Sequence, residues 1–127
     1  MKVLDNLKYT ENHEWVLLEG NIATIGITDY AQNELGDIVF VDVDTLGDEL
    51  DVEDVFGSVE AVKTVSDLFM PVQGKVIEFN DNLEANPELV NSSPYEEGWI
   101  LKVEIDNNTH INDKLLTSEE YKKHIGI

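Results

Sequence analysis

Lys63 is the residue whose position and surroundings best suit covalent chemistry. Apart from His13, it is the only basic residue between Lys8 and Lys75, in a window that holds fifteen Asp and Glu residues. Apolar residues alternate on both sides of it, which predicts two β-strands joined by a turn near the lysine. A long, flexible amine at such a turn suits acylation, which removes the charge and keeps the reach. The alternative is an ordinary surface lysine.

Other residue types that carry catalysis or metal binding form no pattern. His13-Glu14 lacks the second histidine of the zinc-protease motif, because position 17 is leucine. The three histidines, at positions 13, 110 and 124, lie far apart along the chain. Without cysteine the chain has no thiol nucleophile, thiolate metal site or disulfide. No nucleophile elbow and no phosphate-binding glycine loop is present. We expect no metal site and no independent catalysis, so any sulfur chemistry has to come with a cofactor.

The charge balance excludes several classes of partner. The net charge is −19, and all eight basic residues are lysines. Nucleic acids and anionic membranes require clustered Lys and Arg, so we expect neither as a partner. An acidic surface instead favours proteins with basic docking faces. The sequence begins without an apolar signal segment, and we expect a monomeric cytoplasmic protein.

Short alternating segments with glycine turns predict a mainly β protein with a sandwich or barrel core. Besides the two arms around Lys63, the predicted strands are 15–18, 22–27, 38–43, 74–79 and 99–105, and we expect 38–43 to be buried.

Three short helices are predicted at the edges of this β core. Thr28 suits the N-cap of a helix over 29–35 that Gly36 ends. An Asn-Pro pair suits the start of a one-turn helix over 86–91. A capping box at 117–120 opens a C-terminal helix.

Four segments, in order, resemble the H protein of the glycine cleavage system; they are 9–16, 25–32 with 35–37, the segment around Lys63, and 91–99. Two departures from the family pattern are visible. Ala61 and Thr64 stand where the family usually has Ser and Ala beside the modified lysine, and Asp44 replaces a proline. Both changes beside Lys63 keep the turn small, so we expect modification to remain possible.

The resemblance implies a barrel-sandwich hybrid of the lipoyl/biotinyl hammerhead type, with short peripheral helices and a C-terminal helix. It implies one lipoyl-carrier domain over 1–127, with a core over about 4–105 and a helical extension over 106–127. It also implies that Lys63 carries (R)-lipoate in amide linkage.

The resemblance further implies a carrier that catalyses nothing alone. It would take the aminomethyl group of glycine from glycine decarboxylase (P protein) to aminomethyltransferase (T protein). Dihydrolipoyl dehydrogenase (L protein) would reoxidise the arm, and lipoate-attaching enzymes would modify Lys63. Glu14 and Asp67 are the family-matched candidates for a shallow cleft that holds the loaded arm. Glu60 and Gly74 resemble positions that lipoate-attaching enzymes read, and Gly74 also suits a turn.

Four alternatives stay open at this point. A biotin carboxyl carrier has methionines beside its lysine, whereas Val62 and Thr64 stand here. A lipoyl domain of a 2-oxoacid dehydrogenase is shorter, and it lacks the His-Glu-Trp and Ser-Pro-Tyr segments. A plain acidic interaction module would leave Lys63 unmodified. A lipoyl-relay protein would keep the arm and donate acyl groups to other lipoyl domains.

Overall fold

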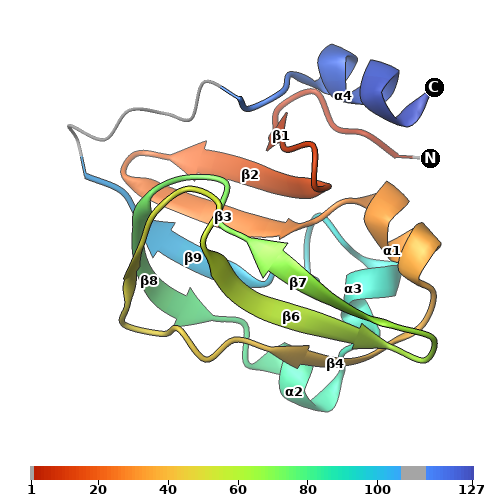
Figure 1. Cartoon of the computed structure of the whole chain (residues 1–127), viewed down its shortest axis with the longest axis horizontal. Coiled ribbons are helices and arrows are strands. Elements are labelled where there is room, and N and C mark those ends of the chain that lie inside the picture. Colours follow the sequence, from red (N-terminus) through yellow and green to blue (C-terminus); the bar gives the residue numbers. More distant parts are fainter. Residues whose placement is uncertain (1, 107–113) are drawn as a thin grey trace.

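The chain folds into two antiparallel sheets with short helices around them (Figure 1). The computed structural model describes residues 2–106 and 114–127. The larger sheet has the order β1-β2-β3-β9-β8-β5 and consists of β1 (Lys8–Tyr9), β2 (Glu14–Glu19), β3 (Ile22–Ile27), β9 (Leu101–Glu104), β8 (Gly74–Phe79) and β5 (Glu49–Leu50). The smaller sheet has the order β4-β6-β7 and consists of β4 (Ile38–Asp42), β6 (Val55–Ala61) and β7 (Val65–Phe69). The predicted mainly β sandwich is therefore confirmed, and among the described residues neither sheet closes into a barrel.

The helices are α1 (Asp29–Leu35), α2 (Asn82–Ala85), α3 (Leu89–Ser92) and α4 (Ser118–Ile125). The predicted cap of α1 is confirmed, because the Thr28 hydroxyl accepts a hydrogen bond from the Ala31 amide at 3.1 Å. The capping box of α4 is confirmed as well: the Thr117 side chain accepts from Glu120 N, and the Glu120 carboxylate accepts from Thr117 N. Within the described ranges, none of these helices has the length and apolar composition needed to cross a membrane.

Two local predictions are wrong. The one-turn helix over 86–91 begins later, at Leu89, because Asn86 instead ends α2 by donating its backbone N–H to Asn82 O. The strand over 38–43 is not buried throughout, since Val39 and Phe40 are 47% and 52% exposed. A register shift between Ile38 and Phe40 interrupts the in–out alternation of β4 and turns the aromatic ring outward.

The main core lies between the two sheets. Ala23, Val103 and Val76 are register partners across the larger sheet, and all three are fully buried. Val59 and Val41 are partners in the smaller sheet and belong to the same buried cluster. Because residues i and i+2 of a strand share a face, this register fixes which side chains point outward.

A second, aromatic cluster holds α4 against the body of the protein. The Tyr121 ring of α4 stacks on the Tyr9 ring of β1, with centroids 4.6 Å apart and planes inclined by 10°. Trp15 and Leu7 complete the buried part of this cluster. The C-terminal helix is thus packed through buried aromatic area rather than through its short helical length.

Candidate functional site

Lys63 lies in the tight turn that joins β6 to β7, as the sequence predicts. Glu60 and Val65 form the last register pair before the turn, and Ala61 N donates to Thr64 O at 2.8 Å. A further hydrogen bond of 3.2 Å from Val62 N to Asp37 O ties the turn to the connection between α1 and β4. The backbone beneath the lysine is therefore held from two sides.

The turn projects from the edge of the molecule (Figure 1). Residues 62–64 within it are all exposed. Lys63 is exposed, and its neighbour Val62 is 73% exposed. An acyl group attached to the Lys63 amine would extend from a hydrogen-bonded turn into the solvent. The residues present thus fit a prosthetic arm in amide linkage.

Glu14 is a buried carboxylic acid at the start of β2, with 1% of its surface exposed. The Thr10 hydroxyl donates to Oε1 of Glu14 at 2.6 Å, and Phe69 N approaches Oε2 at 3.4 Å. Burial raises the pKa of Glu14 to about 7, although both hydrogen bonds act to lower it. Near neutral pH this group is therefore poised between its charged and neutral forms.

Asp67 lies two residues before Phe69 on β7, nearer the Lys63 turn, and it is exposed. Two residues along a strand span roughly 7 Å. The Glu14 carboxyl thus contacts the backbone of β7 from the interior, whereas Asp67 of the same strand is exposed to solvent.

The two residues predicted to guide lipoate attachment lie in different sheets. Glu60 is exposed on β6, three residues before Lys63. Gly74 begins β8 in the larger sheet, where a Cβ would overlap the Val103 side chain and lie 2.6 Å from Glu104 O. The close approach of these strands is sufficient to require glycine at this position.

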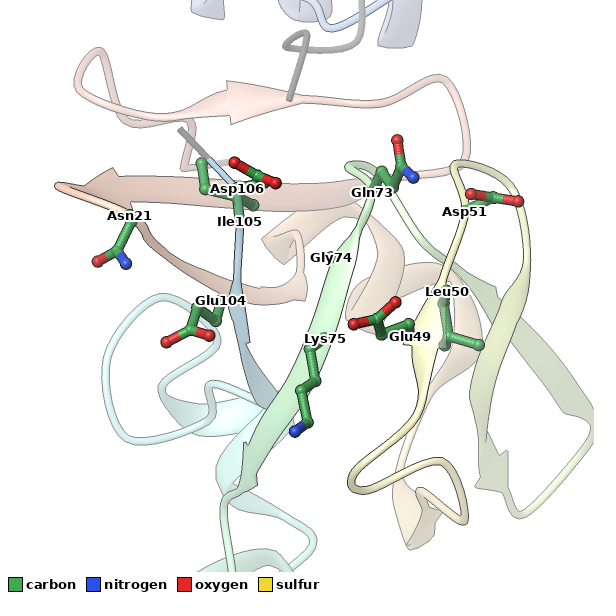
Figure 2. Close-up of a pocket in the computed structure, with 10 residues that line it drawn as sticks. All are labelled: Asn21, Glu49, Leu50, Asp51, Gln73, Gly74, Lys75, Glu104, Ile105 and Asp106. Atoms are coloured by element: carbon green, nitrogen blue, oxygen red, sulfur yellow. The ribbon is translucent and has the colours of Figure 1, made fainter. Parts of the chain in front are cut away.

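Gly74 also lines a pocket of about 710 Å³ at the end of β5, β8 and β9 (Figure 2). The pocket is rich in carboxylates, and its lining residues are Asn21, Glu49, Leu50, Asp51, Gln73, Gly74, Lys75, Glu104, Ile105 and Asp106. Neither Lys63 nor Glu14 lines it, and Figure 1 shows β8 on the side of the molecule away from the β6–β7 turn. The pocket is therefore separate from the candidate site.

Sequence reasoning missed Thr10, the partner of Glu14, and it missed a contact between distant histidines. The rings of His13 and His124 lie 5.6 Å apart, and His13 Nδ1 is 2.9 Å from the Tyr121 hydroxyl. His110 lies outside the described residues. In the part of the chain that the structure describes, no His, Cys, Asp and Glu side chains form a metal-binding group.

A two-sheet sandwich that presents one exposed lysine on a tight hairpin turn defines a class of protein. The arrangement is that of carrier domains, which display a covalently held arm to other enzymes. The described residues around Lys63 form a hydrogen-bonded turn that would hold such an arm and leave it exposed to solvent.

The comparisons identify the family within this class. The sequence model of the glycine cleavage H-protein family matches residues 7–126. The chain is 56% identical over 126 residues to the glycine cleavage system H protein of Staphylococcus haemolyticus (strain JCSC1435), covering 99% of each chain. It superposes on the crystal structure of a glycine cleavage system H protein from Mycobacterium marinum with a TM-score of 0.89 and 32% identity, covering 98% of this chain and all of that one. The chain therefore belongs to the glycine cleavage H-protein family, a family of lipoyl carriers.

Proposed function

We propose that this protein is the lipoyl-bearing carrier of a glycine cleavage system. It receives the aminomethyl group of glycine at the decarboxylase (P protein) and presents it to the aminomethyltransferase (T protein), and the L protein then reoxidises the arm. The observation that supports this most directly is the exposed Lys63 on its anchored turn, in a chain of this family. Tethering the group raises its effective concentration at each enzyme.

Lys63 would hold lipoate through an amide on Nζ, and the lipoyl dithiolane would supply the thiol–disulfide chemistry that a chain without cysteine lacks. The protein's own contribution is to fix the origin of the arm. The hydrogen bond from Ala61 N to Thr64 O closes the turn, and the one from Val62 N to Asp37 O ties it to the body of the protein, so the arm starts from a held backbone.

Glu14 and Asp67 would hold the cationic amine of the carried aminomethyl group. A carboxylate and an ammonium form a charge-assisted hydrogen bond, which is roughly twice as strong as a neutral one. Glu14 needs a partner of this kind, because its burial disfavours the ionised form and a neighbouring cation would favour it. The amine would thereby be protected from premature loss.

The central test is Lys63→Arg, which keeps the charge but cannot form the lipoyl amide. The variant should gain no lipoyl mass when treated with a lipoate-attaching enzyme, and it should support no glycine breakdown with the P, T and L proteins. Lys75→Arg, on strand β8, is the matched control and should behave like the wild type. Glycine breakdown at the wild-type rate by folded Lys63→Arg protein would overturn the proposal.

The role of the carboxylates has its own test. The double variant Glu14→Gln/Asp67→Asn, once lipoylated and loaded, should release ammonia and formaldehyde faster than the wild type. A control that removes two exposed carboxylates elsewhere, Glu19→Gln/Asp81→Asn, should release them at the wild-type rate. An unchanged rate in the first variant would reject the role of Glu14 and Asp67 and leave the carrier function standing.

A further inference from the structure

Exposed apolar side chains lie on the outer face of the smaller sheet and in the Lys63 turn next to it. Phe40 of β4 is the register partner of Glu60 of β6, and Glu60 is in turn the partner of Val65 of β7. Phe40 is 52% exposed and Val65 is 61% exposed, and Val62 in the turn itself is 73% exposed. We call Phe40, Glu60, Val62 and Val65 the turn-side row.

The turn-side row is unusual for the solvent face of a strongly acidic protein. The next row on this face, two residues further from the turn, consists of Asp42, Ser58 and Asp67 and is entirely polar. Scattered exposed apolar residues need no explanation, but a group of them on one face marks an interaction surface. The register shift in β4 that turns Phe40 outward makes this exposure a property of the backbone.

We propose that the turn-side row is the docking surface for the enzyme that attaches the lipoyl group to Lys63. This inference rests on the proposed lipoylation of Lys63. The reason is the short distance between the reacting amine and the turn, because before modification this amine lies at the end of a four-carbon side chain. An active site that encloses Nζ must therefore bring its rim against the residues beside the turn. Enzymes that act on the finished arm work at its far end.

The chemistry of the row also describes the partner's face. Phe40, Val62 and Val65 require an apolar surface that excludes water, and Glu60 in their midst requires a cationic group. Asp42 and Asp67 in the adjoining row extend the negative charge. The partner face is therefore an apolar floor with lysine or arginine at its rim. A second copy of this chain, at a net charge of −19, does not offer such a face.

The test compares lipoylation with later turnover in the same variant. Phe40→Thr/Val65→Thr places threonine, a β-branched and strand-compatible residue, at two exposed positions, so folding should survive, as circular dichroism and the melting temperature would show. Its kcat/KM for lipoylation by a purified lipoate-attaching enzyme should fall about tenfold or more, because loss of apolar anchors at an interface has effects of this order. The conservative variant Phe40→Leu/Val65→Ile should retain most of the rate.

The control is Leu46→Thr/Ile77→Thr, which removes two apolar side chains that are 58% and 40% exposed but lie outside the row. It should be lipoylated at the wild-type rate. When driven to full modification with excess enzyme, Phe40→Thr/Val65→Thr should support glycine breakdown at the wild-type rate. Raising the salt concentration should slow lipoylation of the wild type, because it screens the charges that steer the basic partner.

One result would overturn the docking surface, namely wild-type kcat/KM for lipoylation of Phe40→Thr/Val65→Thr. If the fully modified variant then showed slow glycine breakdown, the row would belong to a different partner. A wild-type protein that gains no lipoyl mass would instead refute the proposed function itself, so the two failures are distinguishable.

Discussion

Replacing Glu14 by glutamine should stabilise the protein at neutral and alkaline pH. Burial raises the pKa of Glu14 from 4.5 to about 7 in the folded protein, and the unfolded chain keeps the ordinary value. Between these two pH values the unfolded state releases a proton that the folded state retains. The free energy of unfolding therefore falls as pH rises from 4.5 to 7 and stays low above that range.

The size of the effect follows from the same shift. Each pKa unit corresponds to about 1.4 kcal/mol, so ionising Glu14 costs the folded wild type about 3 kcal/mol above pH 7. Glutamine keeps an oxygen that can accept from the Thr10 hydroxyl, but its amide group opposes the weak 3.4 Å contact with Phe69 N, at a cost of about 1 kcal/mol. The net gain at pH 8 is about 2 kcal/mol, or about 8 °C in melting temperature for a domain of this size.

The assay is thermal unfolding of the wild type and Glu14→Gln followed by circular dichroism from pH 4.5 to pH 8.5. The difference between them should be small or slightly negative at pH 4.5 and should grow through pH 7. Glu19→Gln changes an exposed carboxylate at the other end of β2 and should follow the wild type at every pH. A difference that is the same at pH 5 and pH 8 would refute the reasoning, because it would show that ionisation of Glu14 is not what destabilises the wild type.

Two further predictions concern the hydroxyl groups of Thr10 and Tyr121. Thr10→Val removes the 2.6 Å hydrogen bond that lowers the pKa of Glu14, so carbon-13 NMR of the Glu14 carboxyl should show a higher pKa. Thr10→Ser keeps the hydroxyl and should retain the wild-type pKa. An unchanged pKa in Thr10→Val would show that this hydrogen bond does not favour the charged carboxylate. Tyr121→Phe removes the hydroxyl that forms a 2.7 Å hydrogen bond with Thr28 and contacts His13. Urea unfolding should therefore show a free energy of unfolding lower by about 1–3 kcal/mol. A decrease smaller than the error of the measurement would contradict the view that this buried hydroxyl stabilises the fold.

Local signals explain which parts of the fold the sequence reveals. The hairpin at Lys63, the Thr28 cap and the capping box that opens α4 each depend on residues within a few positions of one another, and all three are confirmed. The predicted helix over 86–91 begins too early, because Asn also ends helices and the Asn86 backbone N–H donates to Asn82 O of the preceding helix.

The candidate site also combines features that the local sequence reveals with features that long-range contacts decide. An isolated lysine in an acidic window is visible in the sequence, but the burial of Glu14 is not, since it depends on Phe69, which lies 55 residues further along the chain. The outward turn of Phe40 is likewise invisible, because a β-bulge shifts the alternation without changing residue types. Long-range pairing and register, rather than composition, decide both.

The packing of α4 gives a reason why Glu14 can remain buried at all. His13, which directly precedes Glu14, has a backbone φ of 70°, a conformation that costs a non-glycine residue free energy. The Tyr121 hydroxyl contacts the His13 ring and also bonds to Thr28, whose amide N–H donates to His13 O at 2.9 Å. A residue of the C-terminal helix thus fixes the strained turn from which Glu14 enters the interior.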